Sequence, residues 1–150
     1  MTTSRGLSSV AARKRSGFSL IELMIVVAIV AIMSAVAYPS YLKSIQKSRR
    51  ADALSTLVQT QVIFERCYAQ NFSYVVSCSL LPTRAFASPQ GYYTITPSRV
   101  TATAFLLTAT PIPTGSQAGD TRCATISINE TNDRIGKDAN GTLQEECWNP

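Results

Sequence analysis

One long apolar segment of this chain carries a single acid near its start. Residues 18–38 contain one charged side chain, that of Glu22. A helix that crosses a bilayer needs about 20 mostly apolar residues, so this segment is long enough to span a membrane. A carboxylate inside hydrocarbon costs roughly 2.5–3.5 kcal/mol on insertion scales. A passive anchor has no reason to carry that cost, whereas a segment that docks against a neighbour's positive charge has one.

The segment before this apolar stretch, residues 1–17, is basic and contains no acid. Much of the formal charge of +5 therefore belongs to it, and the rest of the chain is close to neutral. Its basic residues are Arg5, Arg13, Lys14 and Arg15. A conventional signal sequence has its small-residue cleavage site after the apolar region, but here Gly17 comes before it. Cleavage at Gly17 would leave the apolar segment on the mature chain.

The chain contains four cysteines and no histidine. Without histidine, a Ser-His-Asp or Cys-His catalytic set is impossible, and the commonest metal ligand is missing. We therefore expect no enzymatic activity, no metal and no cofactor. No two cysteines form a C-x-x-C pair, and an even number at wide spacings is typical of disulfides in an oxidising compartment. The four are Cys67, Cys78, Cys123 and Cys147.

Four cysteines allow three pairings, and the sequence does not choose among them. Cys67 and Cys78 are close in the chain, so we favour two local bridges, Cys67–Cys78 and Cys123–Cys147. The disulfides need the oxidising side of the membrane, which leaves residues 1–17 facing the cytoplasm.

A helical pattern continues beyond the apolar segment. Residues 40–70 contain neither Gly nor Pro, so we predict one helix over residues 18–70, kinked where Pro39 removes a hydrogen bond. Its second half should lie against a sheet through two neighbouring apolar stripes. One contains Leu54, Leu57, Val58 and Val62, and the other contains Leu57, Phe64 and Tyr68. The expected polar positions are Lys43, Lys47, Arg49, Arg50, Asp52, Gln59 and Arg66.

The C-terminal half reads as a small antiparallel sheet. Residues 71–91 lack periodicity and are predicted to be a loop, and β-forming runs follow at residues 92–96, 103–110 and 124–128. Turns are expected at Gly115, Gly119, Gly136 and Gly141. Three strands, or four, would form a meander that covers the helix. Because helix and sheet segregate along the chain, the predicted fold class is α+β.

Two charged groups have competing interpretations. The cluster of Lys43, Lys47, Arg49 and Arg50 is either a solvated helix face near anionic lipid headgroups or a nucleic-acid patch, and no aromatic residues interleave with it to support the second. Asp133 and Asp138, with Glu130 nearby, either ligate calcium or form a solvated acidic turn. The spacing of a calcium loop is absent, which favours the turn.

Residues 17–29 read Gly-Phe-Ser-Leu-Ile-Glu-Leu-Met-Ile-Val-Val-Ala-Ile, and this stretch resembles the class III signal of type IV pilins. Pro39 stands where that family usually has a helix proline. The resemblance implies cleavage after Gly17 by a prepilin peptidase and N-methylation of Phe18. Glu22 would then pair with the Phe18 amine of an adjacent subunit during assembly. Pseudopilins of type II secretion share this segment.

The C-terminal half resembles PilE-type pilins of β- and γ-proteobacteria. The likeness rests on short runs, namely residues 91–95, 107–111 and 117–120, Cys123, and Cys147 with Trp148. It implies a pilin fold, in which a disulfide-bounded D-region of residues 123–147 is exposed on the pilus.

These observations predict three segments: a cleaved leader at 1–17, a helix at 18–70 whose residues 18–38 span the membrane before assembly, and a head at 71–150 with its sheet at 92–128. The resemblance implies a structural subunit, major or minor, of a type IV pilus that serves pilus biogenesis, twitching motility, adhesion or DNA uptake. A type II secretion pseudopilin is the alternative. The implied partners are other pilins, prepilin peptidase, the inner-membrane assembly machinery and the membrane, with DNA possible but unsupported. The expected location is the bacterial inner membrane and then the extracellular filament.

Overall fold

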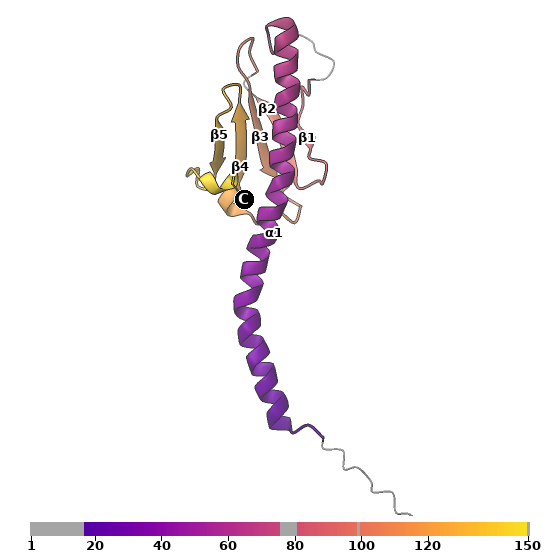
Figure 1. Ribbon diagram of the computed structural model, residues 1–150, viewed down its shortest axis with the longest axis vertical. Coiled ribbons are helices and arrows are strands. Elements are labelled where there is room, and N and C mark those ends of the chain that lie inside the picture. Colours follow the sequence, from indigo (N-terminus) through magenta and orange to yellow (C-terminus); the bar gives the residue numbers. More distant parts are fainter. Residues whose placement is uncertain (1–16, 76–80, 99, 150) are drawn as a thin grey trace, which may run out of the picture. The chain divides into compact units, whose positions relative to one another are not determined.

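The computed structural model describes residues 17–75, 81–98 and 100–149. Its internal contacts divide the chain into two units, residues 1–39 and residues 40–150. The predicted α+β class is confirmed, because one long helix precedes an antiparallel sheet (Figure 1).

Helix α1 runs from Leu20 to Asn71, within two residues of the prediction, and Pro39 lies inside it. The division between the two units falls at this proline. The kink that we expect at Pro39 stays a prediction.

The part of α1 that follows Ser40 buries one stripe of side chains at alternating spacings of three and four residues. This stripe contains Arg50, Ala53, Leu57, Thr60, Phe64 and Cys67. Thr60 fits into it because its hydroxyl donates a hydrogen bond of 2.7 Å to the Thr56 carbonyl, four residues earlier. The polar atom is thereby satisfied inside the packed face.

One of the two predicted apolar stripes is wrong. Val58 and Val62 are 38% and 60% exposed, whereas Leu57 and Phe64 are buried. Both stripes pass through Leu57, and the sheet covers only the one that continues to Phe64. The expected polar positions also include two errors, because Arg50 and Asp52 are buried.

The described residues form a five-stranded antiparallel sheet in the order β1-β2-β3-β4-β5 (Figure 1). The strands are β1 (Phe86–Ala87), β2 (Tyr93–Ser98), β3 (Leu106–Pro111), β4 (Thr125–Asn129) and β5 (Arg134–Lys137). The meander is confirmed, but its predicted extent is too short at both edges. β1 lies inside the predicted loop 71–91, and β5 lies inside the predicted D-region.

The core forms where one face of the sheet meets α1. Ile95, Ala109, Ile126 and Gly136 lie opposite one another across β2 to β5, and all four are buried. Alternate residues of a strand point to opposite faces, so Thr96, Thr108 and Ser127 lie on the other face. Phe64, Tyr74 and Phe105 add an aromatic cluster, with ring centroids 4.8 Å apart for Phe64 and Phe105 and 4.9 Å apart for Tyr74 and Phe105.

A disulfide joins Cys123 to Cys147, the pair that bounds the implied D-region. Gly136 was expected in a turn, but it lies in β5, directly beneath this bridge. A Cβ added at Gly136 would lie 2.4 Å from the Cβ of Cys147, so the strand can pass only because glycine has no side chain. Cys67 is buried. Its favoured partner, Cys78, lies outside the described residues, and the Cys67–Cys78 bridge stays a prediction.

Replacing Leu57 with Ala should lower the free energy of unfolding by about 2–5 kcal/mol, because it leaves a cavity between α1 and the sheet. Val62→Ala is the matched control on the solvent side and should cost no more than about 0.5 kcal/mol. Urea denaturation of the full chain in a non-ionic detergent measures both. Equal losses for the two variants would mean that the packed stripe has been misassigned.

Candidate functional site

The N-terminal unit presents an apolar surface without a partner. Every large apolar side chain from Phe18 to Val36 is exposed, and Phe18 itself is 81% exposed. The helix is long and apolar enough to cross a membrane. Exposed apolar surface of this extent is unfavourable in water, and it fits a segment that lipid or other helices cover.

The residues predicted for cleavage, methylation and assembly lie together at the start of this unit. Gly17 and Phe18 precede α1 in irregular backbone, and Glu22 lies in the first turn of the helix. Negative charge in the first turn is stabilised by the helix dipole. The predicted cleavage point is exposed, and the acid lies close in sequence to the new N-terminus that cleavage after Gly17 would create.

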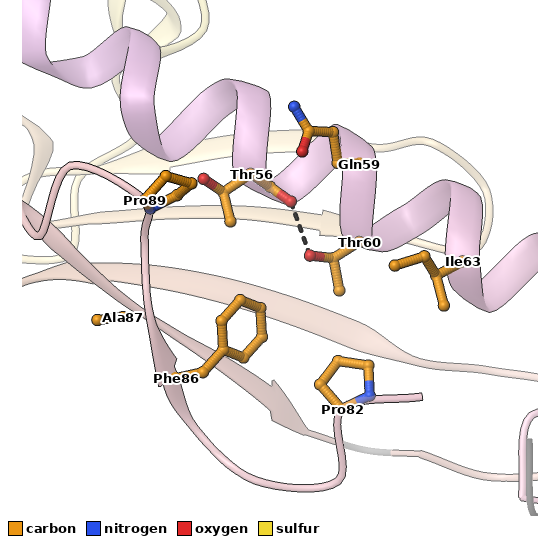
Figure 2. Close-up of a pocket in the computed structure, with 8 residues that line it drawn as sticks. All are labelled: Thr56, Gln59, Thr60, Ile63, Pro82, Phe86, Ala87 and Pro89. Carbon is orange, nitrogen blue, oxygen red and sulfur yellow. Dashed lines mark hydrogen bonds between the residues drawn. The ribbon is translucent and has the colours of Figure 1, made fainter. Parts of the chain in front are cut away.

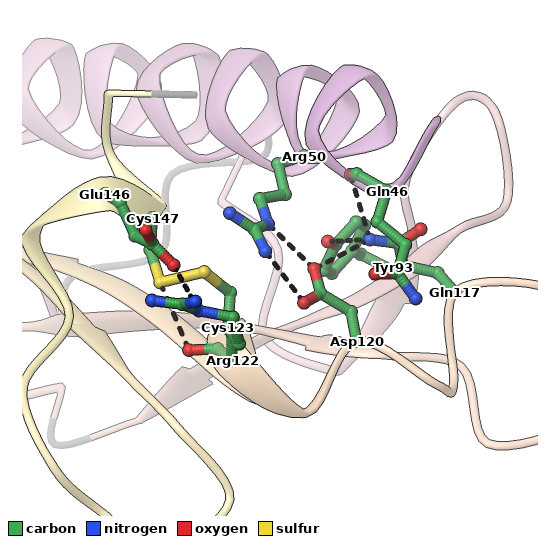
Figure 3. Close-up of polar contacts among 9 residues, drawn as sticks. All are labelled: Gln46, Arg50, Tyr93, Gln117, Asp120, Arg122, Cys123, Glu146 and Cys147. Atoms are coloured by element: carbon green, nitrogen blue, oxygen red, sulfur yellow. Dashed lines mark hydrogen bonds and ion pairs between the residues drawn. A yellow bond between two sulfur atoms is a disulfide. The ribbon is translucent and has the colours of Figure 1, made fainter. Parts of the chain in front are cut away.

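In the C-terminal unit, a buried ion pair ties α1 to the loop that leads into the disulfide (Figure 3). Arg50 donates from Nε to Asp120 Oδ2 at 2.7 Å and from Nη2 to Asp120 Oδ1 at 2.8 Å. The two side chains are 4% and 1% exposed. The hydrogen bonds to Asp120 raise the pKa of the Arg50 guanidinium. Such two-pronged geometry fixes both orientation and distance.

Gln117 extends this pair to the sheet. Its amide nitrogen lies within hydrogen-bonding distance of three acceptors: the Gln46 carbonyl at 3.1 Å, the Tyr93 hydroxyl at 3.0 Å and Asp120 Oδ2 at 2.9 Å. Burial raises the pKa of the Tyr93 hydroxyl to about 12, so this group stays neutral beside Asp120. One side chain thus joins α1, β2 and the loop before Cys123.

Asp52 makes a second buried link, from α1 to the connection between β1 and β2. It accepts hydrogen bonds from the Ser88 hydroxyl and from the Gln90 backbone N–H. Ser88 Oγ in turn accepts from the Tyr93 backbone N–H at 3.0 Å. The short edge strand β1 is therefore held in place by a carboxylate of the helix.

A groove of about 370 Å³ lies between α1 and the β1 edge (Figure 2). It is lined by Thr56, Gln59, Thr60, Ile63, Pro82, Phe86, Ala87 and Pro89. None of these side chains is an acid, a base or a thiol, so the groove offers contact surface and not acid–base chemistry.

A smaller cleft of about 140 Å³, the basic cleft, lies between α1 and the disulfide-bounded region. Its lining residues are Lys43, Gln46, Lys47, Arg50, Arg122 and Glu146. Arg122 Nε and Glu146 Oε1 are 2.6 Å apart on its rim, and their side chains are 62% and 41% exposed. The cluster predicted as a solvated face is therefore split, because Arg50 is buried while Lys43 and Lys47 are exposed.

The fold places aromatic rings beside two of the basic residues. The Arg49 guanidinium carbon lies 4.9 Å from the centroid of the Tyr92 ring, and that of Arg134 lies 5.4 Å from the centroid of a Trp148 ring. These are cation–π distances. Neither pair is close in sequence, so a search for interleaved aromatic and basic residues does not find them.

Two of the acids considered as calcium ligands, Asp133 and Asp138, instead accept hydrogen bonds from residues of the turns in which they lie. Asp133 accepts from Thr131 and Asn129, and Asp138 accepts from the backbone N–H groups of Asn140 and Thr142. These hydrogen bonds lower the pKa of both carboxyl groups. Glu130 instead accepts from the Phe105 backbone N–H. Over residues 17–75, 81–98 and 100–149, no three acids, cysteines or histidines lie together as a metal site requires.

Sequence reasoning missed Arg50, Asp120 and Gln117 as a buried group. One signal could have found Arg50: it precedes Ala53 and Leu57 by three and seven residues, so it continues the stripe that faces the sheet. Nothing in the sequence links it to Asp120, 70 positions later.

Two family models match the chain. The type IV minor pilin ComP, DNA uptake sequence receptor, matches residues 39–127, and the prokaryotic N-terminal methylation motif matches residues 12–38. The first covers more than half of the chain, and the two matches adjoin at Pro39.

Similar proteins from several bacteria match about a third of the chain. Prepilin peptidase-dependent protein D of Escherichia coli (strain K12) is 43% identical over 54 residues, which are 36% of this chain and 37% of that protein. The type IV major fimbrial protein FimA of Dichelobacter nodosus is 43% identical over 53 residues, 35% and 34% of the respective chains. The chain thus spans about a third of the length of these relatives.

The fold is similar to a solved structure, the non-core minor pilin PilV of Neisseria meningitidis. The TM-score is 0.52 at 20% sequence identity, and the match covers 68% of this chain and 96% of that one. At this identity the likeness concerns the fold alone, and it confirms the predicted pilin fold.

Asp120→Asn should lower the free energy of unfolding by roughly 3–5 kcal/mol, because it leaves the charge of Arg50 buried without its counter-charge. Glu146→Gln is the matched control. It removes the acid of the exposed pair with Arg122 and should cost at most about 1 kcal/mol. Chemical denaturation of the full chain compares the two, and similar losses would show that the Arg50–Asp120 pair does not fasten the helix to the head.

Proposed function

The chain belongs to the family of the type IV minor pilin ComP, DNA uptake sequence receptor, and we propose that it is a minor subunit of a type IV pilus that polymerises through α1. This family is structural, so the chain is a pilin subunit and not an enzyme. The observation that carries the proposal is the exposed, largely apolar surface of residues 18–36, in which Glu22 is the only charged residue.

Processing would create the group that Glu22 needs. We propose that prepilin peptidase cleaves after Gly17 and that the new amino group of Phe18 is methylated. The match of the N-terminal methylation motif to residues 12–38 supports both steps. The mature chain then begins with a positive charge four residues before a negative one.

The charge of Glu22 would set the register between subunits. In a medium of low dielectric constant, removing one partner of an ion pair is strongly unfavourable. A neighbouring helix is therefore held where its Phe18 amine meets this carboxylate. Apolar packing along the rest of the segment supplies the non-directional part of the binding free energy.

The same surface accounts for two locations. Before assembly, we propose that residues 18–38 span the bacterial inner membrane and that the head lies on the oxidising side. After extraction by the inner-membrane assembly machinery, the apolar helix packs with other pilins in an extracellular filament. On assembly, the apolar side chains would thus exchange contacts with lipid for contacts with other pilin helices.

A type II secretion pseudopilin is the alternative. Pseudopilins share the N-terminal segment, so only features of the head can distinguish a pilin from a pseudopilin. The disulfide between Cys123 and Cys147 favours the pilin, because pseudopilins commonly lack paired cysteines and often end in a calcium-stabilised loop. Calcium-dependent thermal stability of this chain would favour the pseudopilin.

DNA binding by the head is a second candidate function. The matched family is described as a DNA uptake sequence receptor, and the pairs Arg49–Tyr92 and Arg134–Trp148 set cationic groups on aromatic rings. Proteins that bind DNA commonly combine positive charge for phosphates with aromatic faces for bases.

Glu22→Ala should leave membrane insertion intact and abolish incorporation into filaments, because the carboxylate is needed for pairing and not for insertion. Insertion is measured by membrane fractionation, and incorporation by quantifying the subunit in sheared filaments. Glu145→Ala, which removes an exposed acid of the head, should assemble as the wild type does. Normal amounts of the Glu22 variant in filaments would overturn the proposed pairing.

If the head binds DNA, the affinity of the full chain in detergent for labelled duplex should fall linearly on a plot of log affinity against log salt concentration. Arg134→Gln removes one positive charge and should reduce the magnitude of that slope by about one. Arg84 is exposed and makes no cation–π contact among the described residues, so Arg84→Gln should change the slope less. Undetectable binding at low salt would remove DNA from the proposed function.

A further inference from the structure

The basic cleft carries positive charge that its surroundings do not neutralise. Arg50 is committed to Asp120 and Arg122 to Glu146. In the part of the chain that the structure describes, Lys43 and Lys47 form no ion pair. They are one turn apart on α1, so their ammonium groups lie on the same side of the helix. Two free cations therefore face a cleft whose other charges already pair.

In sequence, the lysines of this cleft follow closely after the proposed membrane span. Lys43 follows Tyr38, the last residue of the span, by five positions. Five helical residues rise about 7.5 Å, and even a fully extended chain would reach only about 17 Å. The headgroup layer on each side of the hydrocarbon is roughly 5–7 Å thick. Lysine side chains at such positions extend their ammonium groups to that layer.

We propose that the basic cleft binds the phosphate of an anionic phospholipid headgroup while the subunit is stored in the membrane. Lys43 and Lys47 supply the charge, and Arg122, which directly precedes the disulfide-bounded region, also lines the cleft. The inference rests on the proposed membrane storage of the subunit. The short chain distance from the span favours a lipid over DNA as the source of the phosphate.

Such a contact would orient the head without trapping it. Each cation near an anionic surface contributes modestly, and the attraction falls within about 10 Å at 0.1 M salt. The cleft would therefore hold the disulfide-bounded region against the bilayer until extraction, and the headgroup would leave without any covalent step.

Native mass spectrometry of the full chain in a non-ionic detergent tests this binding, with phosphatidylglycerol and phosphatidylcholine titrated separately. The wild type should bind phosphatidylglycerol more tightly, and Lys43→Gln/Lys47→Gln should weaken that binding roughly 30-fold while leaving phosphatidylcholine unchanged. Arg66→Gln/Arg84→Gln removes the same charge elsewhere in the C-terminal unit and should behave as the wild type does. Residues 1–17 are common to all three proteins, so differences in binding arise in the C-terminal unit.

Four results would overturn the inference. Equal affinity for the two lipids in a chain that inserts into bilayers would remove the headgroup site and leave membrane storage standing. Competition by inorganic phosphate as strong as that by phosphatidylglycerol would assign the cleft to a free anion. Failure of the wild type to insert into bilayers would remove both the inference and the storage on which it rests. Binding of labelled duplex DNA that is lost in the Lys43/Lys47 variant, without lipid preference, would assign the cleft to nucleic acid.

Discussion

The pairing of Arg50 with Asp120 is the contact on which the arrangement of the C-terminal unit depends. It fixes the helix to the loop that enters the disulfide, and Gln117 extends it to Tyr93 on β2. A buried ion pair adds little net stability compared with apolar packing, but breaking one partner is costly. Its effect here is positional: the apolar stripe could slide along the sheet, whereas two parallel hydrogen bonds admit one register.

The sequence predicted what depends on composition and period. The apolar run and the absence of Gly and Pro after Pro39 were sufficient for α1, and the alternation at residues 124–128 was sufficient for β4. It could not predict β1, because a strand of two residues has no period and exists only through its pairing with Ile95 and Thr94. The stripe through Val58 and Val62 failed because both stripes satisfy helical spacing, and only the sheet decides between them.

The candidate site also has one part that the sequence could predict and one part that it could not. Gly17, Phe18 and Glu22 are adjacent in the chain, so a local motif could identify them. The buried cluster and the basic cleft join residues about 70 positions apart, such as Arg50 with Asp120 and Lys47 with Arg122. The sequence prediction grouped Arg50 with the solvated lysines because of its charge. The type of a side chain does not show whether a distant loop supplies an opposite charge, as Asp120 does here.

The proposed membrane state places charges at both ends of one apolar helix. Glu22 lies in the first turn of α1, and Lys43 and Lys47 follow the span at its other end. An acid inside the apolar segment makes lipid a poor environment, while cations in the headgroup layer make it a good one. Pairing of Glu22 with a neighbouring amine would remove the first penalty only when subunits meet. In the proposed assembly, the Glu22 end of the helix would therefore gain stability from pairing. The proposed headgroup contact at the other end would have to be released.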